Sequence, residues 1–138
     1  MRHIVDKEGL ADSFEIDSAG TSGWHIGNRP DDRMTRAAEN RGISMQGRAR
    51  QVEPNDFESF DWIFAMDDSN YEDLIEVRDA CQHPTARLIR FCEFCEEHEE
   101  TEVPDPYYGG PEGFEKVLDL LEDGCASFLQ RWQSHSLP

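Results

Sequence analysis

The residues Asp61-Trp62-Ile63-Phe64-Ala65-Met66, followed directly by Asp67-Asp68-Ser69-Asn70, decide the fold class of this chain. An apolar run without polar alternation is typical of a strand that is covered on both faces. The polar run after it can cap a helix, which we expect to continue to about Arg78. Because a buried strand that leads into a helix is the repeating unit of α/β proteins, we expect a parallel sheet covered by helices.

Elements of the same two kinds lie on either side of this unit. In chain order, we expect the end of a helix at residues 2–8, a strand at 14–18, a helix at 31–42, a helical turn at 56–60, a strand at 86–91 and an acidic loop at 93–102. The last helix is the clearest. Its apolar residues recur at helical spacing: Phe114, Val117, Leu118, Leu121, Cys125, Phe128, Leu129 and Trp132. No repeat or linker divides the chain, so we expect a single domain over residues 1–138.

The composition indicates which classes of molecule the protein can bind and where in the cell it is found. The chain has 30 Asp and Glu against 13 Lys and Arg, a formal net charge of −17. A field of that sign repels nucleic acids and anionic membranes, so we expect neither as a partner. No apolar run reaches the ~20 residues of a membrane helix, and the first residues lack a signal-peptide core. Since the four cysteines show no secreted disulfide pattern, we expect a cytoplasmic protein.

The stretch Val103-Pro104-Asp105-Pro106-Tyr107-Tyr108-Gly109-Gly110 carries the strongest functional signal. Each proline fixes its own φ and pushes the preceding residue toward extended geometry, so Asp105 has little freedom. The two tyrosines offer an aromatic wall, and the glycine pair lets the backbone turn away. This arrangement can hold a carboxyl group beside a flat aromatic substrate. It predicts half of an active site, and an ordinary Asp-Pro turn is the alternative.

Four motifs in register resemble the low-molecular-weight protein tyrosine phosphatases: Asp-Ser-Ala-Gly-Thr-Ser-Gly-Trp at 17–24, Arg-Ala-Arg-Gln at 48–51, Phe-Ala-Met-Asp at 64–67 with Asn70, and Asp-Pro-Tyr-Tyr-Gly at 105–109. The resemblance covers essentially the whole chain. It implies a three-layer α/β sandwich around a four-stranded parallel sheet, with an N-terminal strand and a C-x5-R-S phosphate loop. The sequence contains no C-x5-R-S, so we expect the first strand, the loop and the start of its helix to be missing.

A C-x5-R spacing does occur from Cys81 to Arg87, but we reject it as the phosphate loop. The five residues between them include no glycine, lose one amide N–H at Pro84 and precede an expected strand. A phosphate loop needs successive amides that point at the anion, and it lies between a strand and the N-terminus of a helix.

The resemblance implies a role for each matching residue of the substrate site. Asp105 becomes the general acid, which protonates the departing phenolic oxygen. Tyr107, Tyr108 and Trp24 become the walls of the cleft, and His25 becomes a specificity position. Plainer roles stay open, namely core packing for the tyrosines and simple solvation for the histidine.

For five more polar residues, a functional and a structural role both stay open. By resemblance, Ser18 braces the phosphate loop, although it can also satisfy the backbone at a strand end. Asp67 lies at the carboxyl edge of the expected sheet, where ligands gather in α/β folds, and it can equally cap the next helix. Arg33, Arg48 and Arg50 can form a positive patch or pair with the many carboxylates.

A zinc site is the rival to a metal-free enzyme. The sequence Cys92-x2-Cys95-x2-His98, with Cys81 and His83 upstream, has ligand types at a credible spacing. We favour the cysteines as small apolar residues at the end of a strand. We therefore expect no metal and no cofactor.

The resemblance implies a phosphatase that hydrolyses phosphotyrosine proteins or small aryl phosphates through a cysteinyl-phosphate intermediate. Because no cysteine has the setting of a low-pKa thiolate, we expect residues 1–138 alone to be inactive. Two explanations stay open: a start upstream of Met1, or a truncated, non-catalytic binding module. An arsenate reductase of the same fold, which relies on extra redox cysteines, is the other enzymatic alternative.

Overall fold

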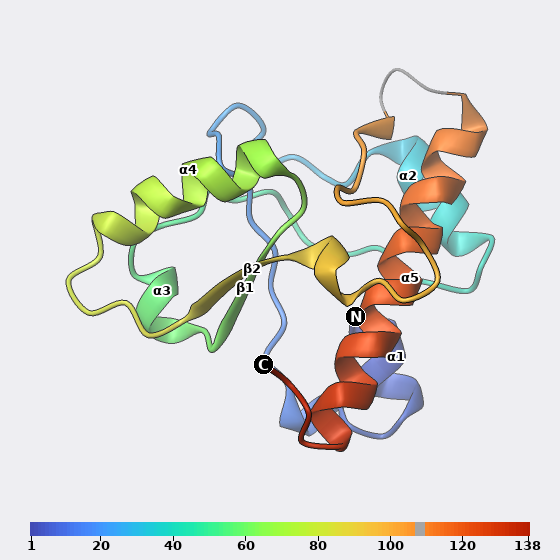
Figure 1. The fold of residues 1–138 in the computed structure, drawn as a ribbon. Coiled ribbons are helices and arrows are strands. Elements are labelled where there is room, and N and C mark those ends of the chain that lie inside the picture. Colours follow the sequence, from blue (N-terminus) through green and yellow to red (C-terminus); the bar gives the residue numbers. More distant parts are fainter. Residues whose placement is uncertain (107–109) are drawn as a thin grey trace.

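The computed structural model describes residues 1–106 and 110–138, so Tyr107, Tyr108 and Gly109 lie outside the described residues (Figure 1). In chain order the elements are α1 (Arg2–Lys7), the 3-10 helix η1 (Ala11–Ser13), α2 (Asp32–Glu39), α3 (Asp56–Ser59), β1 (Trp62–Ala65), α4 (Asp68–Asp79), β2 (Arg87–Arg90), the 3-10 helix η2 (Phe91–Phe94) and α5 (Pro111–Gln133). No helix among these described residues is long and apolar enough to cross a membrane.

The predicted parallel sheet is confirmed as a pair of strands, β1 and β2. Trp62 lies opposite Arg87 and Ala65 lies opposite Arg90. The crossover between the strands is α4, because parallel neighbours cannot be joined by a tight turn. This helix begins directly after β1, where the Asp67 carboxylate accepts a hydrogen bond from the backbone N–H of Asn70 at 2.7 Å.

One face of β1 is covered by α3 and α4. Ile63 and Ala65 point to this side, where they pack with Phe57 of α3 and Leu74 of α4. Phe57 is fully buried, and Ala65 is 1% exposed. Two of the four strand residues are therefore committed to the core on this side.

The other face of β1 is covered by α5 and η2 through a group of aromatic rings. The ring of Phe64 lies 5.2 Å from that of Phe128 and 5.7 Å from that of Phe94, in edge-to-face geometry. Trp62 meets Phe128 at 5.6 Å. Such edge-to-face pairs add ~0.5–1.5 kcal/mol each beyond the burial of their area. The prediction of a strand covered on both faces is confirmed.

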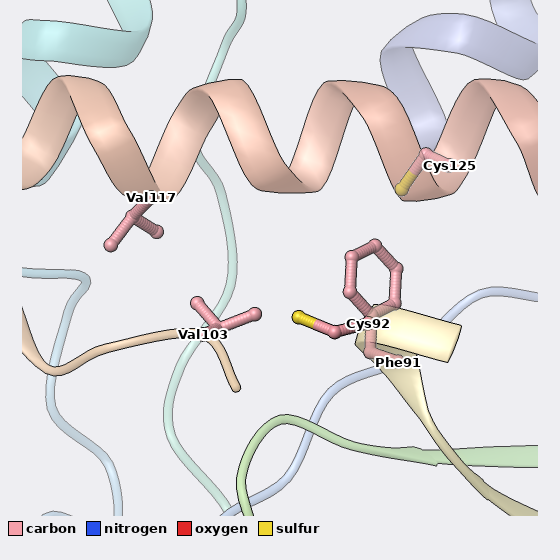
Figure 2. Packing of buried hydrophobic residues seen from close by; sticks show 5 residues of the cluster. All are labelled: Phe91, Cys92, Val103, Val117 and Cys125. Carbon is pink, nitrogen blue, oxygen red and sulfur yellow. The ribbon is translucent and has the colours of Figure 1, made fainter. Parts of the chain in front are cut away.

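The long amphipathic helix α5 contributes to another group of buried residues, which we call the second core cluster. This cluster consists of Phe91, Cys92, Val103, Val117 and Cys125 (Figure 2). It joins the end of β2 and the segment before Asp105 to one side of α5. Because Val103 belongs to the cluster, the core packing reaches to within two residues of the candidate acid.

Two expected elements differ in the structure. Residues 14–18 are extended but belong to no sheet, and the nearest pairing is a single parallel bridge between Gly20 and Gln51. The apolar side chain of Phe14 in this segment packs against α5 instead. The centroid of its ring lies 4.7 Å from that of the Trp132 ring. The strand expected at 86–91 is shorter, because the chain turns into η2 at Phe91. Cys92 therefore lies in a 3-10 helix and not at a strand end.

Candidate active site

The candidate acid Asp105 lies on a hollow of about 900 Å3. The hollow is bounded by α1, α2, α5 and residues 103–106. Asp67, the other acidic candidate, lines the same space. Basic side chains lie on its opposite walls: His3, Lys7, Arg33 and Arg41. The structure thus brings two of the predicted site residues to one cavity.

The segment that carries Asp105 is tied to the sheet by a backbone hydrogen bond. The N–H of Val103 donates to the carbonyl of Met66 at 2.8 Å, and Met66 directly follows β1. The Val103 side chain is 9% exposed and packs in the second core cluster. Asp105 is exposed two residues after this anchor. Its carboxyl group is therefore presented at the carboxyl edge of the sheet, where α/β proteins bind ligands.

Ser18 lies on a second hollow of about 290 Å3, between residues 17–21 and β1. Asn70 of α4 and Met66 line this hollow too, and Met66 also lines the larger one. Both hollows therefore border the residue that directly follows β1. The sequence analysis gave Met66 no functional role, although its place at the end of the apolar run was a signal for this position.

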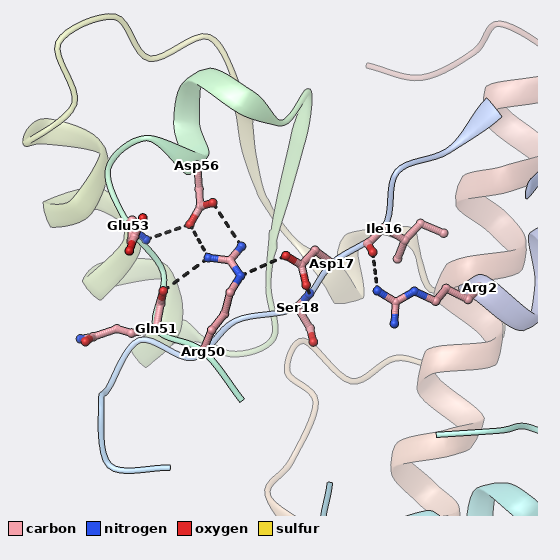
Figure 3. A network of polar contacts seen from close by, with 8 residues as sticks. All are labelled: Arg2, Ile16, Asp17, Ser18, Arg50, Gln51, Glu53 and Asp56. Atoms are coloured by element: carbon pink, nitrogen blue, oxygen red, sulfur yellow. Dashed lines mark hydrogen bonds and ion pairs between the residues drawn. The ribbon is translucent and has the colours of Figure 1, made fainter. Parts of the chain in front are cut away.

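Arg50 fixes the segment before Ser18 against α3 (Figure 3). Its terminal nitrogens donate to the two carboxylate oxygens of Asp56 at 3.0 and 3.1 Å, and its Nε donates to Asp17 at 3.0 Å. Burial alone would raise the pKa of Asp56, but the hydrogen bonds from Arg50 and from the backbone N–H of Glu53 lower it overall. Arg50 is thus paired with carboxylates, as Arg33 is with Asp31.

Trp24 and His25 occupy a turn beside these hollows and line neither of them. Trp24 is 88% exposed. The Nδ1 of His25 lies 3.4 Å from the side-chain nitrogen of Asn28. The turn is joined to the site at its first residue, since Thr21 lines the smaller hollow and its hydroxyl accepts from the Asn70 amide at 3.5 Å. The roles predicted for Tyr107 and Tyr108 fall outside the described residues.

The four cysteines have the settings of structural residues. Burial raises the pKa of Cys92 and Cys125, and it raises the pKa of Cys95 to about 12. Cys81 follows the C-terminus of α4, and its N–H donates to the carbonyl of Arg78. Its side chain packs against the cluster of Phe57, Ala65 and Leu74.

The residues of the rival zinc site are engaged in other contacts. The Nδ1 of His98 lies 2.7 Å from a carboxylate oxygen of Asp123, and the thiol of Cys95 donates to the carbonyl of Leu120 at 3.5 Å. Within residues 1–106 and 110–138, no group of three or more metal-ligating side chains converges.

Comparison with known proteins identifies the family. The family model described as "Low molecular weight phosphotyrosine protein phosphatase" matches residues 1–136. This chain belongs to that family. A Synechocystis sp. protein whose name places it among the low molecular weight protein-tyrosine-phosphatases is 48% identical over 94% of this chain and 82% of its own length. The low molecular weight phosphotyrosine protein phosphatase of Schizosaccharomyces pombe is 40% identical over 94% and 83%.

Solved structures of phosphatases share the fold. A protein tyrosine phosphatase from Entamoeba histolytica, with Hepes in its active site, superposes with a TM-score of 0.90 at 36% identity, over 99% of this chain and 86% of that one. A Drosophila structure described as an arginine phosphatase superposes with a TM-score of 0.88 at 30% identity, over 95% and 84%. The expected α/β fold with a parallel sheet and covering helices is therefore the fold of low molecular weight phosphatases.

Proposed function

We propose that the protein acts on phosphotyrosine proteins or small aryl phosphates, with Asp105 as the general acid. The observation that carries the proposal is the anchor at Val103, which presents the Asp105 carboxyl group over the hollow at the end of β1. Family membership supports a phosphatase, and the exposed Trp24 ring beside the site supports an aromatic substrate. In this proposal Tyr107 and Tyr108 complete the aromatic wall, and His25 tunes specificity.

The proposed reaction has two steps and needs neither a metal nor a cofactor. A cysteine thiolate attacks phosphorus, the bond from phosphorus to the phenolic oxygen breaks, and that oxygen takes the proton of Asp105. Water then attacks the cysteinyl-phosphate and gives one proton to the Asp105 carboxylate. The sulfur–phosphorus bond breaks, which releases phosphate and restores the thiolate. One carboxyl group thus serves as acid and then as base.

We propose further that residues 1–138 by themselves do not catalyse this reaction. The thiols of Cys92, Cys95 and Cys125 are held protonated by burial, and Cys81 packs against the cluster of Phe57, Ala65 and Leu74. A nucleophile in this family's C-x5-R-S loop would have to come from another segment. Ser18 and Asp67, on the two hollows, are suitably placed to support such a loop.

The geometry of β1 supports an additional strand next to it. Among the described residues, the one sheet partner of β1 is β2. The smaller hollow is lined by Trp62, Ile63 and Phe64 of β1 and by no residue of β2, so it lies along the other edge. A strand placed between this edge and residues 17–21 would pair with β1 and lead toward the larger hollow. We propose that the complete sheet contains this strand, within one domain that includes residues 1–138.

The location of the protein is part of the proposal as well. All four cysteines are free thiols in the structure, and two of them are buried. This fits a reducing compartment such as the cytoplasm. We expect neither nucleic acids nor anionic membranes as partners, because a net charge of −17 repels both.

The decisive experiment compares two chains. One is residues 1–138, and the other carries an added N-terminal strand and C-x5-R-S loop taken from a relative. We expect the extended chain to hydrolyse p-nitrophenyl phosphate and a phosphotyrosine peptide in the presence of a metal chelator. We expect Asp105→Asn to lower its kcat by ~10²–10⁴-fold with little change in KM.

Three results would contradict parts of this proposal. A folded extended chain that prefers phosphoarginine to phosphotyrosine would change the substrate class. A normal kcat for Asp105→Asn would remove the general acid. Turnover by residues 1–138 that disappears in Cys81→Ser would show that this chain carries its own nucleophile, while arsenate-dependent oxidation of its thiols would favour a reductase.

A further inference from the structure

An exposed apolar pair stands beside the candidate site without an assigned partner. Among the described residues, three large apolar side chains are exposed, and two of them share one turn: Trp24 is 88% exposed and Ile26 is 58% exposed. Large apolar side chains that a fold holds in water side by side are a common mark of a binding surface.

The turn that carries this pair is held firmly to a second segment. The N–H of Gly27 donates to the carbonyl of Ala49 at 2.7 Å, and the N–H of Ala49 donates to the carbonyl of Asn28 at 2.8 Å. Gly20 is bonded in the same way to Arg50 and Val52, at 2.8 and 2.9 Å. Because both ends of the turn are fixed, the pair is presented on a preorganised surface, which lowers the entropic cost of binding.

Two arginines flank the apolar pair. Arg29 follows Asn28, and Arg48 precedes Ala49, so they extend from the two backbones that these hydrogen bonds join. Both are exposed, and neither has an ion pair with any residue that the structure describes. Arg33, Arg41, Arg50 and Arg90 are paired with carboxylates of the chain itself, whereas the charges of Arg29 and Arg48 are open to an external partner.

We propose that Trp24, Ile26, Arg29 and Arg48, which we call the loop surface, bind acidic residues that flank the phosphotyrosine of a peptide substrate. The inference rests on the proposed phosphatase function and names its substrate class. The guanidinium groups pair with Asp and Glu side chains of the peptide, while the apolar pair covers its backbone and aliphatic carbons. Tryptophan and arginine are also the residues that most often dominate peptide and protein interfaces.

The position of the loop surface agrees with a role for flanking residues. Its turn begins at Thr21, which lines the smaller hollow and bonds to Asn70. Met66 lines both that hollow and the larger one, on which Asp105 lies. A peptide whose phosphotyrosine enters beside Asp105 can therefore run outward across the loop surface. The net charge of −17 disfavours the approach of such a peptide in general, and the two arginines offset that repulsion on the loop surface.

The test uses the extended chain with two phosphotyrosine peptides of equal length. One peptide has Asp and Glu on both sides of the phosphotyrosine, and the other has Asn and Gln at the same positions. We expect a higher kcat/KM for the acidic peptide, and we expect Arg29→Ala with Arg48→Ala to reduce that preference by about tenfold. Arg78→Ala, which removes one positive charge from the last turn of α4, should keep the preference.

A binding measurement separates this inference from the catalytic one. The unphosphorylated acidic peptide, labelled with a fluorophore, is titrated with the same chain, and its anisotropy is followed. Binding that is lost in the double arginine variant supports the loop surface even if the chain shows no turnover. Equal kcat/KM values for the two peptides, with no anisotropy change, would overturn the inference while the phosphatase stands. Dimerisation that buries Trp24 would overturn it as well, because a second copy would then be the partner.

Discussion

Phe91 occupies the space that a side chain at position 124 would need. A Cβ added to Gly124 would lie 2.5 Å from Cζ and 2.6 Å from Cε1 of the Phe91 ring. The ring is 5% exposed and belongs to the second core cluster, so it has little room to move. The absence of a side chain at Gly124 thus lets η2 approach α5 and places the end of β2 against the long helix.

Gly124→Ala should therefore destabilise the protein, although alanine is the better helix former. Overpacking costs ~1–3 kcal/mol, and the gain in helix propensity returns about 1 kcal/mol. We expect the free energy of unfolding to fall by up to about 2 kcal/mol, measured by urea denaturation. Gly113→Ala is the matched control on the same helix, because its Cβ would meet Pro106 at an ordinary 3.7 Å. A control that loses as much stability as the test variant would refute the packing argument.

The Val103 anchor gives a second prediction. Val103→Ala keeps the N–H that donates to Met66 but removes buried apolar carbons from the second core cluster. We expect a loss of about 1–2.5 kcal/mol in the free energy of unfolding. Asp105→Asn, two residues later and exposed, should leave stability within about 0.5 kcal/mol. If both variants were equally stable, the side chain of Val103 would not hold this segment.

Elements with a strong local signal were predictable from the sequence. The apolar run before Asp67 identified β1, and the helical spacing up to Trp132 identified α5. Each pattern is set by which residues of one short segment face the core. The segment 14–18 has an equally regular pattern but belongs to no sheet, because pairing depends on a second segment that its own residues do not specify.

The same limit applies to the candidate site. The two flanking prolines predict that the backbone of Asp105 has little freedom. The position of Asp105 on a hollow could also be expected, because ligands bind at the carboxyl edge of such a sheet. The partner of His98 could not be predicted from the sequence, because Asp123 lies 25 residues away along the chain. Cys92 and Cys95 drew attention to His98 as a zinc ligand, whereas a carboxylate on α5 holds it.

Asp123 should contribute stability that depends on pH. Burial alone would raise its pKa, but hydrogen bonds from His98 and from the backbone N–H groups of Glu96 and Glu97 lower the pKa below its ordinary value of 3.8. A lowered carboxyl pKa stabilises the folded state above pH 3.8, and this contribution is lost as the pH falls toward the folded value. Asp123→Asn should therefore cost about 2–3 kcal/mol at neutral pH. The difference in the free energy of unfolding between Asp123→Asn and the parent protein should shrink below pH 3.8.

Asp119→Asn controls for the loss of charge on α5. The Asp119 carboxylate is 47% exposed and contacts Arg41, so this variant should lose less than about 1 kcal/mol. Thermal unfolding of the three proteins across the acidic range gives the comparison. A difference between Asp123→Asn and the parent that stayed constant down to strongly acidic pH would contradict the role of the lowered pKa.

The ion pair between Arg50 and Asp56 should contribute to stability and should also control the pKa of Asp56. The Asp56 carboxylate is 14% exposed and the Arg50 side chain is 35% exposed, so the pair is only partly screened by water. Arg50→Gln removes the fork that holds both oxygens of Asp56 and leaves that carboxylate without its cation. We expect a loss of about 1–2 kcal/mol, with a smaller loss for Arg50→Lys, which keeps the charge.

The pKa of Asp56 provides a separate test of the same pair. With Arg50 present it lies below its ordinary value, and once the guanidinium is gone, burial is left as the largest influence and should raise it. A carboxyl-carbon NMR titration of the parent and Arg50→Gln would follow this shift directly. Arg33→Gln, which breaks a pair exposed by 48% and 45%, should leave the Asp56 titration unchanged. An Asp56 pKa that stayed low in Arg50→Gln would show that the backbone N–H of Glu53, and not the guanidinium, sets it.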